Sequence, residues 1–131
     1  MALPILGSDS WTATRVAAVP AFEGTFFTQH WLPEVQNDQN TRFMASYAAA
    51  YQREPLPTAA LTYDALQLVF LAIQRQNSLL PEDIQRGLAS ITDYQGVSGT
   101  IGYHGNGDPA KNVVIVKIQN LKPSFYKSVT P

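Results

Sequence analysis

The chain has 131 residues, the length of one small domain, and 45% of them are hydrophobic, so a buried core is possible. Its 9 basic and 10 acidic residues give a net charge of −1, which favours binding neither to nucleic acid nor to a membrane surface. It contains no cysteine, which excludes disulfides, thiolate catalysis and zinc sites with cysteine ligands.

The N-terminal segment predicts a strand, a helix and a second strand. Residues 3–6 are apolar and strand-like, and Ser8–Ser10 offers side chains that commonly cap helices. We expect the helix at about residues 10–19, because Pro20 would interrupt it. Residues 23–31 are rich in threonine and phenylalanine and predict the second strand.

The middle of the chain predicts a series of helices. A polar turn at residues 37–41 leads into the first, whose apolar side chains recur at three- and four-residue steps until Pro55 interrupts it. A second, strongly apolar helix is expected at about residues 58–76. The third begins at Pro81, where the next acidic residues suit the positive end of a helix dipole.

The C-terminal part predicts strands joined by tight turns. Glycines punctuate an otherwise alternating pattern between residues 94 and 108, and glycine adopts the positive φ of hairpin turns without strain. Strands are also expected at residues 112–119 and about 124–129. The predicted order is therefore β-α-β-α-α-α-β-β-β with a further strand at the end, which indicates an α/β fold.

Four segments resemble one known family. They are Pro4–Trp11, Ala21–Phe26, Ala60–Leu66 and the glycine-rich Tyr94–Pro109. In this order and spacing they are similar to the C-terminal end of type I periplasmic binding proteins, and most of all to the branched-chain amino acid receptors of ABC transporters. The resemblance spans nearly the whole chain. It implies an α/β fold of the type I periplasmic-binding-protein kind, present as a C-terminal segment with incomplete lobes.

The resemblance also implies how the chain is divided. Residues 1–33 would form a strand-helix-strand unit of the second lobe, residues 34–93 the helical part, and residues 94–131 the returning hairpin strands. Hinge segments would lie near residues 30–34 and again near 94–101. Closure of the hinge around a bound solute would then be the mechanism.

Candidate ligand-binding residues follow the first predicted strand. In amino-acid-binding members of the family a carboxylate at this position pairs with the α-ammonium group of the ligand, and the resemblance implies this role for Asp9. Ser8 would lie beside it, and Trp11 would line the cleft. Two other interpretations stay open, because Asp9 could cap the following helix and Trp11 could belong to the core. Tyr63 and Asp64 are carried over from the family as structural residues.

The implied function is the capture of a small polar solute, an amino acid or a related compound, for an ABC-transporter permease. The parent protein would work in the periplasm or outside the cell, whereas this N-terminus has no signal peptide, which favours a fragment. A ligand-sensing or assembly domain of a signalling protein is the alternative. Self-association of the fragment is also expected, because unpaired strand edges and uncovered helices invite association.

No enzyme signature accompanies these features. His30 and His104 have no partner at metal-binding spacing, and the sequence lacks a phosphate loop, a nucleophile elbow and a paired-carboxylate constellation. Ser8 and Ser10 with a remote histidine are too little to predict a hydrolase. We therefore expect neither catalysis nor a metal or other cofactor, and we expect both histidines at the surface or in loops.

Overall fold

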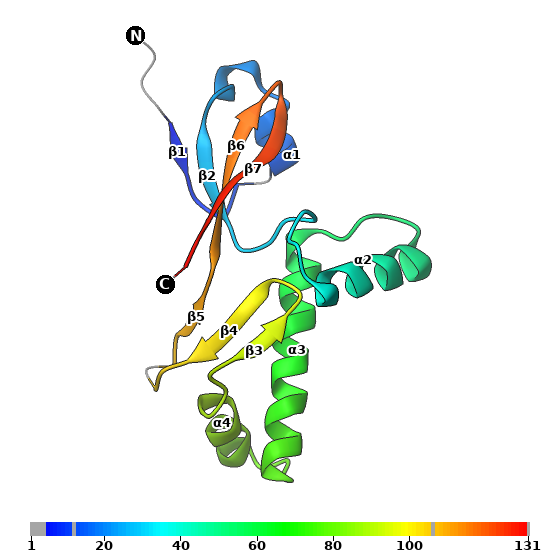
Figure 1. Ribbon diagram of the computed structural model, residues 1–131, viewed down its shortest axis with the longest axis vertical. Helices are drawn as coiled ribbons and strands as arrows, with labels where there is room; N and C mark the ends of the chain where they lie inside the picture. Colours follow the sequence, from blue (N-terminus) through cyan, green and yellow to red (C-terminus); the bar gives the residue numbers. More distant parts are fainter. Residues whose placement is uncertain (1–4, 12, 106, 131) are drawn as a thin grey trace.

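The structure, a computed structural model, describes residues 5–11, 13–105 and 107–130. The chain folds into two bodies that lie one above the other in Figure 1. The upper body holds residues 5–29 and 113–129, and the lower body holds residues 38–111. All extensive contacts between elements lie within one body or the other. The α/β class predicted from the sequence is confirmed.

A mixed sheet forms the upper body. Its strands are β1 (Leu6–Gly7), β2 (Phe26–Gln29), β6 (Val113–Gln119) and β7 (Lys122–Val129), in the order β1-β2-β6-β7. β1 is parallel to β2, whereas β2 with β6 and β6 with β7 are antiparallel. The short helix α1 (Ala13–Ala17) packs against β6 and β7, and a 3-10 turn at Pro20–Phe22 leads towards β2.

The core of the upper body lies between α1 and the sheet. Every second side chain of β6 is buried, namely Val114, Val116 and Ile118, as expected for a strand with one face against a core. Phe27 of β2 and Ala17 of α1 join this cluster. The buried face of β6 thus forms the contact surface for α1.

Helices and a small antiparallel sheet form the lower body. Its elements are α2 (Asp38–Tyr51), α3 (Pro57–Gln76), α4 (Pro81–Ala89), β3 (Tyr94–Gly96), β4 (Gly99–Tyr103) and β5 (Pro109–Lys111). The strand order is β3-β4-β5, and α4 packs along α3 (Figure 1). Leu68 of α3, Ile101 of β4 and Ile91 form a buried cluster between them.

Helix ends in the lower body follow from local chemistry. The side chain of Asn37 caps α2 by accepting a hydrogen bond of 2.7 Å from a backbone N–H one turn later. Pro57 and Pro81 stand in the first turns of α3 and α4, where a missing N–H costs nothing. Gln52 and Asn77 end α2 and α3 in the left-handed conformation. Within the described ranges, no helix is long and apolar enough to cross a membrane.

The chain passes from the upper to the lower body through residues 30–37, which we call the first crossing. Trp31 anchors it, because its side chain is fully buried in a lower-body cluster and its Nε1 donates to Asn40 Oδ1 at 2.9 Å. The chain returns at Asn112, between β5 and β6, which we call the return crossing. The hinge expected near residues 94–101 was wrong, since these residues pair as the β3–β4 hairpin inside the lower body.

The ends of several predicted elements differ from the observed ones. The strand expected at residues 23–31 covers only Phe26–Gln29, and the strand expected at about 124–129 begins at Lys122. The helix expected at residues 10–19 covers only residues 13–17, because the chain first makes a turn in which Trp11 N donates to Ser8 O at 3.2 Å. The strand expected at residues 3–6 falls largely outside the described residues, and β1 begins at Leu6.

Candidate functional site

The predicted ligand-binding residues lie in the loop that follows β1, at the carboxyl end of this strand. Ser8 and Ser10 share a hydrogen bond of 2.7 Å between their hydroxyl groups. The Asp9 side chain is about half exposed, with a relative accessibility of 54%. Open α/β sheets bind ligands beyond the carboxyl ends of their strands, so Asp9 occupies a position that suits a ligand.

Gln29, the last residue of β2, and His30, the first residue of the first crossing, contact this loop. Gln29 Nε2 donates to the backbone oxygens of Asp9, at 3.3 Å, and Trp11, at 3.0 Å. His30 Nε2 lies 3.3 Å from Asp9 Oδ2, while His30 Nδ1 is buried and has no hydrogen-bond partner among the described residues. His30 lies outside the helices and strands, in agreement with the expected surface or loop position, but its pairing with Asp9 was not predicted.

Trp11 packs towards the core of the upper body. Its ring lies edge-on to Phe22 at 5.3 Å between centroids and tilted against Phe27 at 6.1 Å. The indole also covers Gly7, where a Cβ atom would stand 2.5 Å from the ring. Trp11 remains partly exposed, so it contributes to the core without being fully buried.

A buried carboxylate in the lower body binds the turn of the β3–β4 hairpin. Asp64 of α3 is 1% exposed, and its two oxygens accept hydrogen bonds from Val97 N at 2.7 Å, Ser98 N at 2.8 Å and Ser98 Oγ at 2.6 Å. The turn of the β3–β4 hairpin can approach this closely because residue 96 is glycine, whose added Cβ would stand 2.7 Å from Asp64 Oδ2. The structural role expected for Asp64 agrees with these contacts.

Lys111 links this buried carboxylate to the first crossing. Its Nζ donates to Ser98 Oγ at 2.7 Å and to the backbone oxygen of His30 at 3.1 Å. Burial lowers the pKa of Lys111 to about 8, and the charge of Asp64 partly offsets this effect. Burial also raises the pKa of Tyr94 to about 12, with Asp64 and Tyr63 adding to the shift.

The sequence identified one part of this arrangement and missed another. Asp9 stood out through its motif, and Asp64 was carried over from the family resemblance as a structural residue. Gln29, Ser98 and Lys111 carried no local signal, because ordinary polar residues at strand ends and turns are common. Their roles depend on contacts with distant segments.

The arrangement favours binding over catalysis. The carboxylate of Asp9 is exposed and fixed at its backbone, so it can accept hydrogen bonds from a cation. The hydroxyls of Ser8 and Ser10 bond to each other, whereas His30 pairs with Asp9, which does not assemble a nucleophile with a base. Among the described residues, no group of histidine and acidic side chains could hold a metal ion.

Comparison with known proteins gives a consistent result. Residues 2–122 match the family described as periplasmic binding protein. A leucine-binding protein from Thermotoga maritima is 31% identical and superposes with a TM-score of 0.84, covering 96% of this chain and 37% of its own. Another similar structure is a branched-chain amino acid transporter substrate-binding protein from Streptococcus pneumoniae, solved with isoleucine. It is 25% identical and superposes with a TM-score of 0.80, and the match covers 98% of this chain and 37% of that protein.

A more distant relative shares the fold. A solute-binding protein of an ABC transporter from R. palustris, solved with benzoate, is 21% identical with a TM-score of 0.78, covering 98% of this chain and 36% of its own. No curated protein matches the chain. The chain thus spans well under half the length of these solved structures, at 36–37%.

Proposed function

This chain belongs to the type I periplasmic binding proteins, and from that premise we propose that it is the C-terminal part of a receptor that captures an amino acid or a related small solute for an ABC transporter. One observation carries the proposal. The Asp9 carboxylate is held, half exposed, beyond the end of β1 and beside His30, the residue at which the first crossing begins. The receptor would act in the periplasm or outside the cell and deliver its solute to a permease.

The chemistry of Asp9 fits the α-ammonium group of an amino acid. An ammonium taken out of water needs a charged acceptor in a fixed place, and a carboxylate at hydrogen-bond distance supplies it. His30 and Gln29 restrict the carboxylate and its loop, so little entropy remains to be lost on binding. The exposed Ser8 adds a hydroxyl to the same loop, and the partly exposed Trp11 adds an aromatic ring.

The two crossings support hinge closure as the mechanism. Upper and lower bodies are joined by the first crossing and by Asn112, and a solute held between them would favour the closed state by contacting both. This chain covers 37% of the Thermotoga maritima leucine-binding protein, so the two complete lobes of a receptor of that length would need further residues. Strong binding would therefore need the remainder of the receptor.

Calorimetry on the isolated chain tests whether strong binding needs the remainder of the receptor. We expect leucine, isoleucine and benzoate to bind weakly or not at all, because one wall of the cleft is lacking. Binding in the micromolar range by the isolated chain would contradict it.

A chimaera tests whether Asp9 contributes to solute binding in a complete receptor. This chain would replace the matching segment of the Thermotoga maritima leucine-binding protein, to which it is 31% identical. We expect the chimaera to bind leucine, and Asp9→Asn to weaken binding at least tenfold, or about 1.4 kcal/mol. Asp93→Asn, at an exposed acid in the lower body, is the matched control. Equal affinities for the two variants would refute the role of Asp9.

A further inference from the structure

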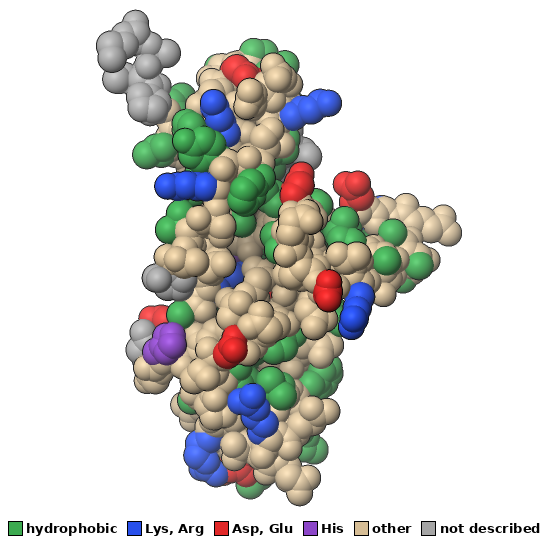
Figure 2. Space-filling view, in the orientation of Figure 1, with side chains coloured by type: hydrophobic (Ala, Val, Ile, Leu, Met, Phe, Trp, Pro, Cys, Tyr) green, Lys and Arg blue, Asp and Glu red, His purple; other side chains and the backbone are tan. Residues whose placement is uncertain are grey.

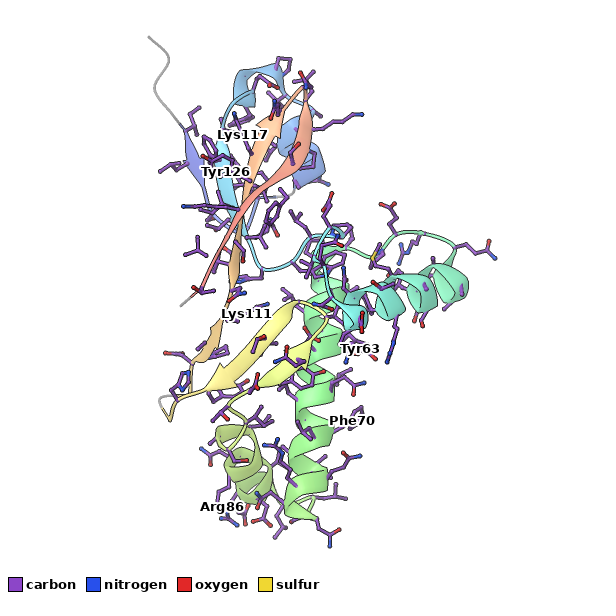
Figure 3. The ribbon with its side chains drawn as sticks, in the orientation of Figure 1. Tyr63, Phe70, Arg86, Lys111, Lys117 and Tyr126 are labelled. Atoms are coloured by element: carbon purple, nitrogen blue, oxygen red, sulfur yellow. The ribbon has the colours of Figure 1, made fainter. Side chains whose placement is uncertain are left out.

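Lys111 stands where the chain returns to the upper body. β5 ends at this residue, Asn112 follows, and β6 begins at Val113. In Figure 3 its side chain lies at the junction, beside the β3–β4 hairpin and below the upper sheet. Its Nζ bonds to the backbone oxygen of His30, so a residue next to the return crossing is tied to the start of the first crossing.

The other contact of Lys111 leads into the rigid interior of the lower body. Ser98 Oγ accepts from Lys111 Nζ at 2.7 Å and donates to Asp64 Oδ2 at 2.6 Å. Asp64 stands on the longest helix, α3, and is fixed by two further backbone donors. The Ser98 hydroxyl therefore connects the Lys111 ammonium to Asp64 on α3. The same ammonium also donates to the backbone oxygen of His30.

The upper and lower bodies are not closely packed against each other along the whole of this junction. A cavity of about 320 Å³ lies there, lined by the first crossing, the β3–β4 turn, Asn112 and two β7 residues, Phe125 and Ser128. An apolar interface would fix the angle by close packing, whereas a cavity allows the walls to move. Directional hydrogen bonds across the crossings then decide the angle.

We propose that Lys111 is a positioning residue that locks the angle between the upper and lower bodies by bonding His30 O and Ser98 Oγ, and that it thereby sets where the Asp9 carboxylate stands relative to the opposite side of the cleft. The path runs from Ser98 through Lys111 to His30, whose ring Nε2 lies 3.3 Å from Asp9 Oδ2. The consequence for Asp9 rests on the proposed binding function. The proposed lock on the angle between the two bodies does not depend on the binding function, because it involves no solute.

The lock should respond to pH in a defined direction. The titratable groups around the ammonium in the described part of the chain are Asp64 on α3, Tyr103 on β4 and His30 in the first crossing. Because the pKa of Lys111 is lowered to about 8, the ammonium predominates at pH 7 and is lost as the pH rises through 8. Charge-assisted hydrogen bonds are about twice as strong as neutral ones, so the lock loosens above that pH.

Distances between paired spin labels measure the angle without any ligand. The chain has no cysteine, so Gln85→Cys in α4 and Lys122→Cys in β7 place one label on each body at exposed positions. At pH 7 we expect one narrow distance distribution. In Lys111→Met the distribution should become at least twofold broader. The same broadening should occur in the labelled parent chain at pH 9.5, and Lys111→Arg, which keeps its charge, should prevent it.

Two controls make the result decisive. Lys117→Met removes a lysine of β6 that lies over the ring of Phe26, outside the junction, and should leave the distribution narrow. Labels at Ala50→Cys and Gln85→Cys, both in the lower body, should keep their distance in Lys111→Met and so show that this body remains folded.

The proposal is overturned if Lys111→Met matches Lys117→Met, if the Arg variant broadens at pH 9.5 like the parent, or if the parent is already broad at pH 7. None of these outcomes depends on the solute. Failure of the lock is thus separable from failure of the binding proposal, which the chimaera tests.

Discussion

Asp64 shows how a single buried charge is stabilised in this protein. A carboxylate out of water is costly unless hydrogen bonds replace its hydration, and three donors of the β3–β4 turn do so here. The donors lie 33 and 34 residues further along the chain. Asp64 therefore fixes the hairpin to α3 and gives Ser98 the orientation that Lys111 uses.

Asp64→Asn should destabilise the fold by about 3 kcal/mol. An amide offers one acceptor in place of two, and its NH₂ group would face the N–H of Val97 or Ser98. Urea denaturation measures the change in the free energy of unfolding. Asp93→Asn, whose carboxylate accepts a hydrogen bond from Gln95 at an exposed site, should change it by less than about 0.5 kcal/mol. Equal losses in both variants would show that the buried network contributes no stability.

At the scale of elements, the β6–β7 hairpin illustrates a turn with an unfavourable residue. Its two turn residues, Asn120 and Leu121, have φ of 55° and 57°, as a type I′ turn requires. Leucine avoids this conformation, which costs about 1–2 kcal/mol. Glu23 compensates, because its carboxylate accepts from both backbone N–H groups, at 2.9 and 3.0 Å, and these bonds lower its pKa.

Leu121→Gly should therefore stabilise the protein by about 0.5–1 kcal/mol, since relief of the turn exceeds the larger entropy of glycine in the unfolded chain. Thermal unfolding measures the gain as a higher melting temperature. Leu121→Ala is the control, because it removes the same half-exposed side chain but keeps the strained φ. A gain that is equal in both variants would assign the effect to the side chain and not to the turn.

At the scale of the whole molecule, apolar side chains remain on the surface. Tyr63, Leu66 and Phe70 of α3 are 43%, 52% and 54% exposed and recur at helical spacing on one face. Figure 3 labels Tyr63 and Phe70 on the outer side of α3, and Figure 2 shows hydrophobic side chains over this part of the lower body. Leu6, on the edge strand β1, is 77% exposed.

We predict that the isolated chain self-associates through these surfaces, because contiguous exposed apolar area favours association. Light scattering at high protein concentration should give a mass above that of the monomer. Replacing Leu66 and Phe70 together by glutamate should lower this mass, whereas glutamate at the exposed Gln85 of α4, outside this face, should not. A clean monomer for the parent chain at high concentration would contradict the prediction.

Local chemistry determined much of this molecule from the sequence by itself. Apolar residues at helical spacing predicted α3 within one residue of its observed ends, and a proline in the first turn predicted where α4 begins. Alternating valine and isoleucine predicted β6. The motif around Asp9 indicated both the family and the candidate ligand-binding loop. Each of these features depends on neighbours in sequence, so a pattern of residues suffices.

Tertiary structure alone decided the junction between the bodies. Lys111 bonds to a residue 81 positions earlier, and Ser98 bonds to one 34 positions earlier. Which distant polar groups meet depends on how helices and sheets pack, and residue type carries little of that information. For this reason the sequence placed the second hinge at residues 94–101, whereas the folded chain returns at Asn112, beside the lysine that joins both crossings.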